Sequence, residues 1–191
     1  MCIRDSFISF IVGFYSFKPK GYFDYKGFKV YKTKLPGINV NFYVIPVKSY
    51  SGKIIQTTLR NDPRSFENIS VDVRNSLYGN ITKVWLTSSP ELPSDSIIAQ
   101  GEIGRFSEAL GLNTSYALTE NISNYNTIDC SDANSNVRVI EIREGNKSRV
   151  YSEGYCIIIE GSNANEMIKV SDKFVLTWLE RLALKAKEEL S

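Results

Sequence analysis

Histidine is completely absent from this 191-residue chain. It is the usual general base of enzymes and the commonest zinc ligand, and it completes the Ser-His and Cys-His nucleophile pairs. An enzyme with this sequence would have to work with carboxylates, lysine, tyrosine or a lone cysteine. The net charge is only +2, so no electrostatic argument favours nucleic acid as a partner.

Catalytic and cofactor motifs are missing as well. There is no P-loop, nucleophile elbow or zinc-ligand spacing, and the glycines of "GEIGRF" fall inside a helix pattern, unlike those of a dinucleotide fingerprint. The oxygen-rich stretch "DCSDANSN" lacks the regular ligand spacing of a calcium loop. We therefore expect no catalytic residue, no cofactor and no metal ligand, and the sequence leans against an enzyme.

The residues that are present suit one globular domain. Hydrophobic residues make up 42% of the chain and charged residues 23%, which is the usual balance of a folded protein. We expect a single α/β or α+β domain over residues 28–191.

The first 27 residues divide into three segments of different character. Residues 1–6, "MCIRDS", look like translated sequencing-adapter sequence and are interpreted as an artefact. Residues 7–17 form an apolar run about half as long as a membrane span, which we interpret as a truncated transmembrane or signal-anchor segment. A buried segment or a signal-peptide core is the alternative. Residues 18–27 mix lysines with aromatic rings, as juxtamembrane segments do. A first β-hairpin or a single-stranded nucleic-acid surface would also fit.

Two features of the sequence indicate, in opposite directions, which side of the membrane the domain occupies. Lysines after the apolar run favour the cytoplasm by the positive-inside rule. A cysteine pair and five N-x-[ST] sequons favour the outside, because glycan acceptors mark surface loops of exported proteins. We expect the domain outside the cell membrane, as a glycoprotein. The candidate glycosylation sites are Asn68, Asn80, Asn113, Asn121 and Asn146.

Cys130 and Cys156 are predicted to form a disulfide. The alternative for Cys156, inside the apolar run "YCIIIE", is a small buried hydrophobic residue. That reading suits Cys130 poorly, because its neighbours include Asp129 and Asp132. The same carboxylates make Cys130 a poor nucleophile, since they raise a thiol pKa.

Hydrophobic periodicity predicts strands within residues 28–47, 53–60, 81–89 and 114–120, and a helix within residues 90–113. Residues 137–161 predict a hairpin centred on Gly145-Asn146, with Arg138 opposite Glu153 and Ile140 opposite Tyr151. Residues 163–190 predict a long amphipathic helix that begins at an Asn163 N-cap. The expected fold is a mixed β-sheet packed by a central helix and a long C-terminal amphipathic helix.

Two sets of polar residues are further candidates. Arg60 and Arg64 flank Asp62 in "LRNDPRS", where a structural salt-bridge cluster is favoured over an anion-binding site made by the two arginines. An enzyme acting on envelope polymers could instead use paired carboxylates. The carboxylate candidates are Asp62, Asp72, Asp129 and Asp132.

The stretches "LRNDPRS", "KVWLTSSPELPSDSIIAQGEIGRF", "IDCSDAN" and "YCIIIEGSNANEMIKVSDK" carry a family resemblance. The chain resembles an uncharacterised family of single-span, membrane-anchored archaeal proteins of unknown function, over most of residues 22–184. The resemblance implies paired cysteines and a transmembrane helix before the domain. No activity, ligand or catalytic residue comes with it.

The expected function is a membrane-tethered extracytoplasmic domain with a binding or structural role in the cell envelope. Its partners would be the membrane, through the N-terminal segment, and envelope proteins or glycans, with no nucleic acid. The alternatives are the carboxylate-dependent enzyme and a cytoplasmic-side adaptor that binds anionic lipid through its lysines and aromatic rings.

Overall fold

The computed structural model describes residues 21–34, 37, 39–48, 54–73, 76–77 and 79–188. The segments interpreted as an adapter artefact (residues 1–6) and as a truncated membrane span (residues 7–17) lie outside these residues. Within the described part of the chain, no helix is both long and apolar enough to cross a membrane.

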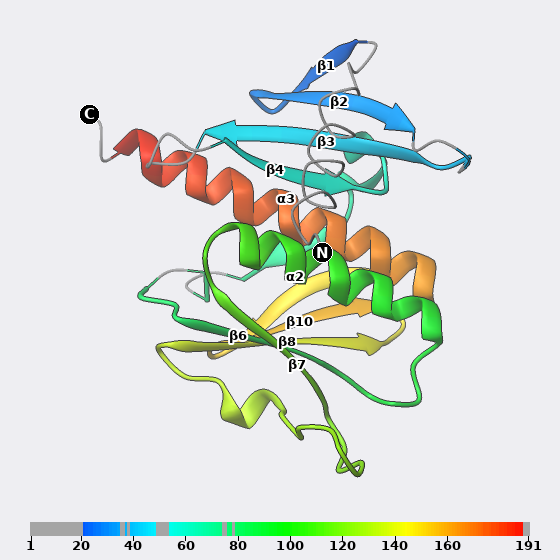
Figure 1. Ribbon diagram of the computed structural model, residues 1–191, viewed down its shortest axis with the longest axis vertical. Helices are drawn as coiled ribbons and strands as arrows, with labels where there is room; N and C mark the ends of the chain where they lie inside the picture. Colours follow the sequence, from blue (N-terminus) through cyan, green and yellow to red (C-terminus); the bar gives the residue numbers. More distant parts are fainter. Residues whose placement is uncertain are drawn as a thin grey trace, which may run out of the picture.

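Two helices lie between two β-sheets, so the fold has three layers (Figure 1). The four-stranded sheet is antiparallel, in the order β1-β2-β3-β4, and the six-stranded sheet is mixed, in the order β5-β9-β10-β8-β6-β7. The predicted mixed sheet, central helix and long C-terminal helix are therefore confirmed. The strands of the first sheet are β1 (Tyr22–Tyr25), β2 (Phe28–Lys34), β3 (Asn41–Lys48) and β4 (Ile54–Leu59). Those of the second are β5 (Ser70–Asp72), β6 (Lys83–Ser88), β7 (Asn113–Leu118), β8 (Val137–Glu144), β9 (Arg149–Glu153) and β10 (Cys156–Gly161).

Helix α3 (Ala164–Glu188) begins and helix α2 (Ile97–Ala109) ends at signals that the sequence contains, whereas α2 begins after Ser96 without a side-chain cap hydrogen bond. Helix α3 is capped by Asn163, whose Oδ1 accepts a hydrogen bond of 3.0 Å from the Glu166 amide. Helix α2 is followed by Gly111, whose φ of +84° is a backbone conformation that glycine adopts without strain. Three short 3-10 helices complete the fold: η1 (Pro63–Phe66), η2 (Ser94–Ser96) and η3 (Cys130–Asp132).

The predicted hairpin between residues 137 and 161 is wrong. Strand β10 lies between β8 and β9, parallel to β8 and antiparallel to β9, so β8 and β9 do not pair. All six residues of β10 are buried, and a strand buried on both faces belongs in the interior of a sheet. The tight turn falls at Gly154, where φ is +60°, and joins β9 to β10 instead.

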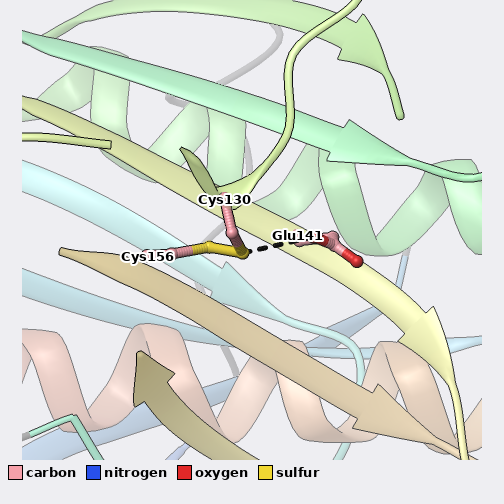
Figure 2. Close-up of side chains that lie close together, drawn as sticks. All are labelled: Cys130, Glu141 and Cys156. Carbon is pink, nitrogen blue, oxygen red and sulfur yellow. Dashed lines mark hydrogen bonds between the residues drawn. A yellow bond between two sulfur atoms is a disulfide. The ribbon is translucent and has the colours of Figure 1, made fainter. Parts of the chain in front are cut away.

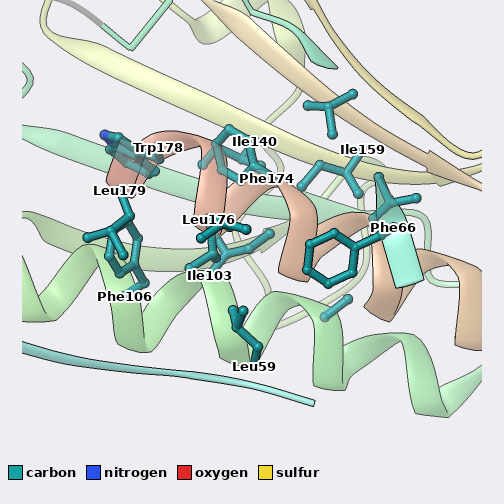
Figure 3. Packing of buried hydrophobic residues seen from close by; sticks show 14 of the residues in the cluster. Leu59, Phe66, Ile103, Phe106, Ile140, Ile159, Phe174, Leu176, Trp178 and Leu179 are labelled. Atoms are coloured by element: carbon teal, nitrogen blue, oxygen red, sulfur yellow. The ribbon is translucent and has the colours of Figure 1, made fainter. Parts of the chain in front are cut away.

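The main core fills the space between the helices and both sheets (Figure 3). Phe174 and Trp178 of α3 are nearly or fully buried, and the Trp178 ring meets the Phe106 ring of α2 edge-on at 5.6 Å. Leu59 of β4 closes the core from the four-stranded sheet, and Ile140 of β8 closes it from the six-stranded sheet. One apolar core therefore holds the three layers together.

The lysines and aromatic residues near the N-terminus pack within a β-hairpin. Strand β1 pairs with β2, and Lys29 places its ammonium 4.7 Å from the centre of the Tyr22 ring. Lys26 forms an ion pair of 3.2 Å with Glu180 of α3. From the sequence, residues 18–27 are interpreted as a juxtamembrane segment, with a β-hairpin as one alternative. The described part of this segment, residues 21–27, forms the first strand and the turn of such a hairpin.

Candidate functional site

A disulfide ties a long polar segment to the six-stranded sheet. Side chains alternate between the two faces of a strand, so Val139, Cys156 and Ile158 lie on the face opposite the helices, in a separate small apolar cluster. Residues 119–136 run over this face, and Cys130 at the start of η3 bonds to Cys156 (Figure 2). The two Cα atoms are 5.2 Å apart, as in ordinary disulfides. The predicted pairing is therefore present in the structure.

Helix η3 is held by its own acidic residues. Asp129 Oδ1 accepts hydrogen bonds from the Ser131 amide and hydroxyl, and Asp132 Oδ2 accepts one of 2.9 Å from the Asp129 amide, which together form a capping box. The Ser131 hydrogen bonds lower the pKa of Asp129. These two candidate catalytic carboxylates therefore serve as caps that fix the position of Cys130.

Glu141 of β8 lies against the disulfide. Its Oε2 is 3.2 Å from Cys130 Sγ (Figure 2). Its Oε1 accepts a hydrogen bond of 2.9 Å from Arg143 Nε and lies 2.8 Å from Arg143 Nη2 in the same ion pair. A disulfide sulfur carries no proton, so the sulfur–oxygen approach is a contact and not a hydrogen bond. Glu141 is absent from the sequence-based candidates because only the β8–β10 pairing places it beside Cys156.

A second cluster of charges lies between β4, α2 and α3. Arg60, which follows β4, donates from Nε to Oε1 of Glu102 on α2 at 2.5 Å. Asp172 on α3 accepts from the Arg60 amide at 3.1 Å, and from the Asn61 amide and side-chain Nδ2 at 2.8 Å each. Asp172 is fully buried and Glu102 is 5% exposed. The cluster thus links the four-stranded sheet to both helices.

Burial and a neighbouring carboxylate favour the protonated form of Glu102 at neutral pH. Burial, together with the charge of Asp172 and a hydrogen bond to it, raises the pKa of Glu102 to about 9. Burial also raises the pKa of Asp172, against the hydrogen bonds from Glu102, Asn61 and the Arg60 amide. Oε2 of Glu102 is buried without a hydrogen-bond partner, so a negative charge on this carboxylate would be poorly compensated there. We therefore assign a proton to Glu102.

This protonation makes stability depend on pH. Glu102 is protonated in the folded chain up to about pH 9, whereas in the unfolded chain it ionises near its ordinary pKa of 4.5. Between these two pH values, unfolding therefore releases a proton. The free energy of unfolding should therefore fall as pH rises through this window, by about 1.4 kcal/mol between pH 6 and pH 7. Glu102→Gln, which mimics the protonated carboxyl, should remove the part of this slope that Glu102 contributes, in urea denaturation measured at several pH values; a slope that remains belongs to other groups such as Asp172. An unchanged slope would place the proton elsewhere.

The arginines predicted to bind an anion are each paired with a carboxylate. Arg64 donates to Asp62 from Nε at 2.8 Å, and its guanidinium lies 4.3 Å from the centre of the Phe23 ring. The hydrogen bond from Arg64 lowers the pKa of Asp62. Arg60 binds Glu102, as described above. The Arg64–Asp62 part of the expected salt-bridge cluster is therefore present, whereas Arg60 pairs with Glu102 and not with Asp62. Anion binding stays a prediction.

The four carboxylates proposed for a catalytic pair do not gather in one site, and the two that lie together, Asp129 and Asp132, cap η3. Asp62 caps η1, which packs on α3, whereas Asp129 and Asp132 cap η3 on the opposite face of the six-stranded sheet. Asp72 ends β5, the edge strand of that sheet. The buried carboxylates that meet, Glu102 and Asp172, lie within apolar helix patterns, where the sequence alone suggests no pairing.

All five sequon asparagines are exposed. Asn68 follows η1, Asn80 precedes β6, and Asn113 begins the edge strand β7. Asn121 lies in the polar segment that the disulfide ties down, and Asn146 lies in the connection between β8 and β9. A glycan at any of these positions would extend into solvent.

Comparisons of the chain with protein-family models, with curated proteins and with solved structures give no match. Two features of the described residues bear on chemistry: a disulfide beneath a polar segment, and a buried pair of carboxylates with raised pKa values. These two features are the basis for the functional inference below.

Proposed function

We propose that the protein is a membrane-tethered extracytoplasmic domain with a binding or structural role in the cell envelope. The disulfide between Cys130 and Cys156 carries this proposal. Disulfides form and persist in oxidising compartments and are rare in the cytosol, where thiols are kept reduced. A cross-link in the interior of the fold, with Cys156 fully buried, suits a protein that matures outside the cytosol.

The surface of the domain supports the same compartment. The segment at residues 119–127 is mostly exposed and rich in Asn, Ser and Thr, and the disulfide fixes the residues that follow it to the sheet. Anchored loops on a rigid sheet are where binding residues are usually placed. This segment is therefore the surface through which we expect the domain to contact envelope proteins or glycans.

The proposed tether is the apolar run at residues 7–17. It precedes the β1–β2 hairpin, in which tyrosine rings and lysines lie side by side. Aromatic rings and lysines are favoured at the membrane–water interface, so the hairpin is suited to a position close to the bilayer. The resemblance to single-span archaeal proteins implies the same arrangement.

The compartment can be tested by peptide mass mapping, without reduction, of the protein isolated from its native membrane. We expect a linked Cys130–Cys156 peptide, together with sugar on Asn113 or Asn121. The same digest after reduction is the control, because it should release both cysteine peptides. Free thiols and bare asparagines would contradict the proposal and favour the cytoplasmic adaptor that binds anionic lipid.

The buried pair of Glu102 and Asp172, in which the pKa of Glu102 is raised to about 9, favours a carboxylate-dependent enzyme, since acid–base catalysis uses such pairs. A catalytic carboxyl must come within hydrogen-bond reach of its substrate. Asp172 is fully buried beneath the chain that follows β4, and three of its hydrogen bonds are to Arg60 and Asn61. The pair is therefore better explained as a structural link between the layers.

A further inference from the structure

Three side chains that commonly bind zinc meet at the far face of the six-stranded sheet. The ligand atoms of Cys130, Glu141 and Cys156 all lie within 4.8 Å of one another. They come from three different elements, η3, β8 and β10, which are fixed by the capping box and by the sheet. We propose that, once the disulfide is reduced, these three side chains form a binding site for a thiophilic divalent cation such as Zn²⁺.

The orientation of Glu141 is the strongest argument for the site. Arg143 occupies Oε1, and Oε2 faces the sulfur of Cys130. Carboxylate ligands of metals are commonly held in this way, with hydrogen bonds from neighbouring side chains that fix the carboxylate plane. Without a cation, a Cys130 thiolate would lie beside a negative oxygen, which is unfavourable.

The charges and distances suit zinc. Two thiolates and one carboxylate carry three negative charges. Zinc supplies two positive charges and Arg143 supplies the third, so the site is neutral. Zinc bonds to sulfur at about 2.3 Å in tetrahedral sites, so the two sulfurs would have to lie about 3.7 Å apart. Cys156 is fixed in β10 and fully buried, whereas Cys130 is partly exposed on a short 3-10 helix and can rotate. The fourth position would hold water.

The redox step balances with a dithiol as the reductant. The dithiol supplies two electrons and two protons, the Cys130–Cys156 bond breaks to give two thiols, and the dithiol becomes a disulfide. Zinc then binds the two thiolates and releases both protons, so binding should strengthen as pH rises. The polar segment would be tied to the sheet by the covalent bond in the oxidised chain and by the metal in the reduced chain. The metal site forms only where a dithiol keeps the cysteines reduced, and its chemistry does not rest on the proposed function.

The test uses the full chain carrying Cys2→Ala, so that its only thiols are Cys130 and Cys156. The protein is reduced with a dithiol, desalted without oxygen and titrated with Co²⁺ and with Zn²⁺ against a coloured chelator. We expect one ion per chain and thiolate-to-cobalt charge-transfer absorption. Glu141→Gln should weaken zinc binding at least tenfold, and Arg143→Gln by about 10-fold to 100-fold. Glu144→Gln, an exposed carboxylate on the same strand, is the matched control and should bind as the parent does.

Equal zinc affinity of the oxidised and reduced chains would overturn the proposal, and so would an unchanged zinc affinity of Glu141→Gln. Reduction could also unfold the protein. In that case, circular dichroism of the reduced chain with and without Zn²⁺ should show that zinc restores the folded spectrum and raises the thermal midpoint. A reduced chain that zinc neither binds nor refolds would contradict the site.

Discussion

Asp172→Ala is expected to lower the free energy of unfolding by about 3–5 kcal/mol, the cost of breaking a buried charged network by removing one partner. The substitution leaves the amides of Arg60 and Asn61, and the Asn61 side chain, without their acceptor inside the protein. It also removes the carboxylate whose charge helps to raise the pKa of Glu102. Because these contacts join the four-stranded sheet to α3, the loss should be seen in the global unfolding transition. Urea denaturation at pH 7 measures it.

Two variants separate the causes. Asp172→Asn keeps the shape and one oxygen acceptor but removes the charge, so its loss should be smaller than that of Asp172→Ala. Asp95→Ala removes an exposed carboxylate at η2 and should change the free energy of unfolding by no more than about 0.5 kcal/mol. If Asp172→Ala behaved like this control, the cluster would not be what joins the layers.

The second large effect is expected from replacing both disulfide cysteines by alanine. The cross-link closes a loop over a sequence separation of 26 residues. In the chain-entropy model such a loop is worth about 3.5 kcal/mol, because the cross-link restricts the unfolded chain. We expect Cys130→Ala/Cys156→Ala to lose this amount in denaturation. Hydrogen exchange at residues 128–136 should speed up as well, because this segment would no longer be tied to β10.

Cys2→Ala provides the matched control, since it removes a cysteine that is not part of the disulfide. It should leave the free energy of unfolding and the exchange rates unchanged. If Cys130→Ala/Cys156→Ala were as stable as this control, the loss of the disulfide would add little conformational freedom to the unfolded chain. The packing of Ile128 and Ala133 against the sheet would then suffice to hold the segment.

Local signals in the sequence were enough for the helices. The Asn163 cap and the spacing of Met167, Val170, Phe174 and Trp178 predicted α3, and the structure buries all four apolar residues. A helix completes its hydrogen bonds within one short segment, so its limits depend on nearby residues. The positions of β2, β3, β4, β6 and β7 were predicted for the same kind of reason, from runs of apolar residues bounded by turns.

Strand pairing was not predictable in this way. The hairpin proposed around Gly145-Asn146 assumed that consecutive strands are neighbours, but β10 takes the place beside β8. Which strand becomes a neighbour depends on the total burial available in the finished sheet, and an all-apolar strand gains most in the interior. The cysteines could still be paired correctly, because β10 lies next to the strand that follows the Cys130 segment.

The sequence by itself determined the fold class, the presence of both helices, the N-cap of α3 and the disulfide partners, since each depends on composition or on residues close together in the chain. Only the tertiary structure decided which charges meet. Arg60, Glu102 and Asp172 are separated by 42 and 70 residues, and Glu141 reaches the sulfurs only through the β8–β10 pairing. Such contacts form when distant segments pack into one core, so no short stretch of sequence encodes them.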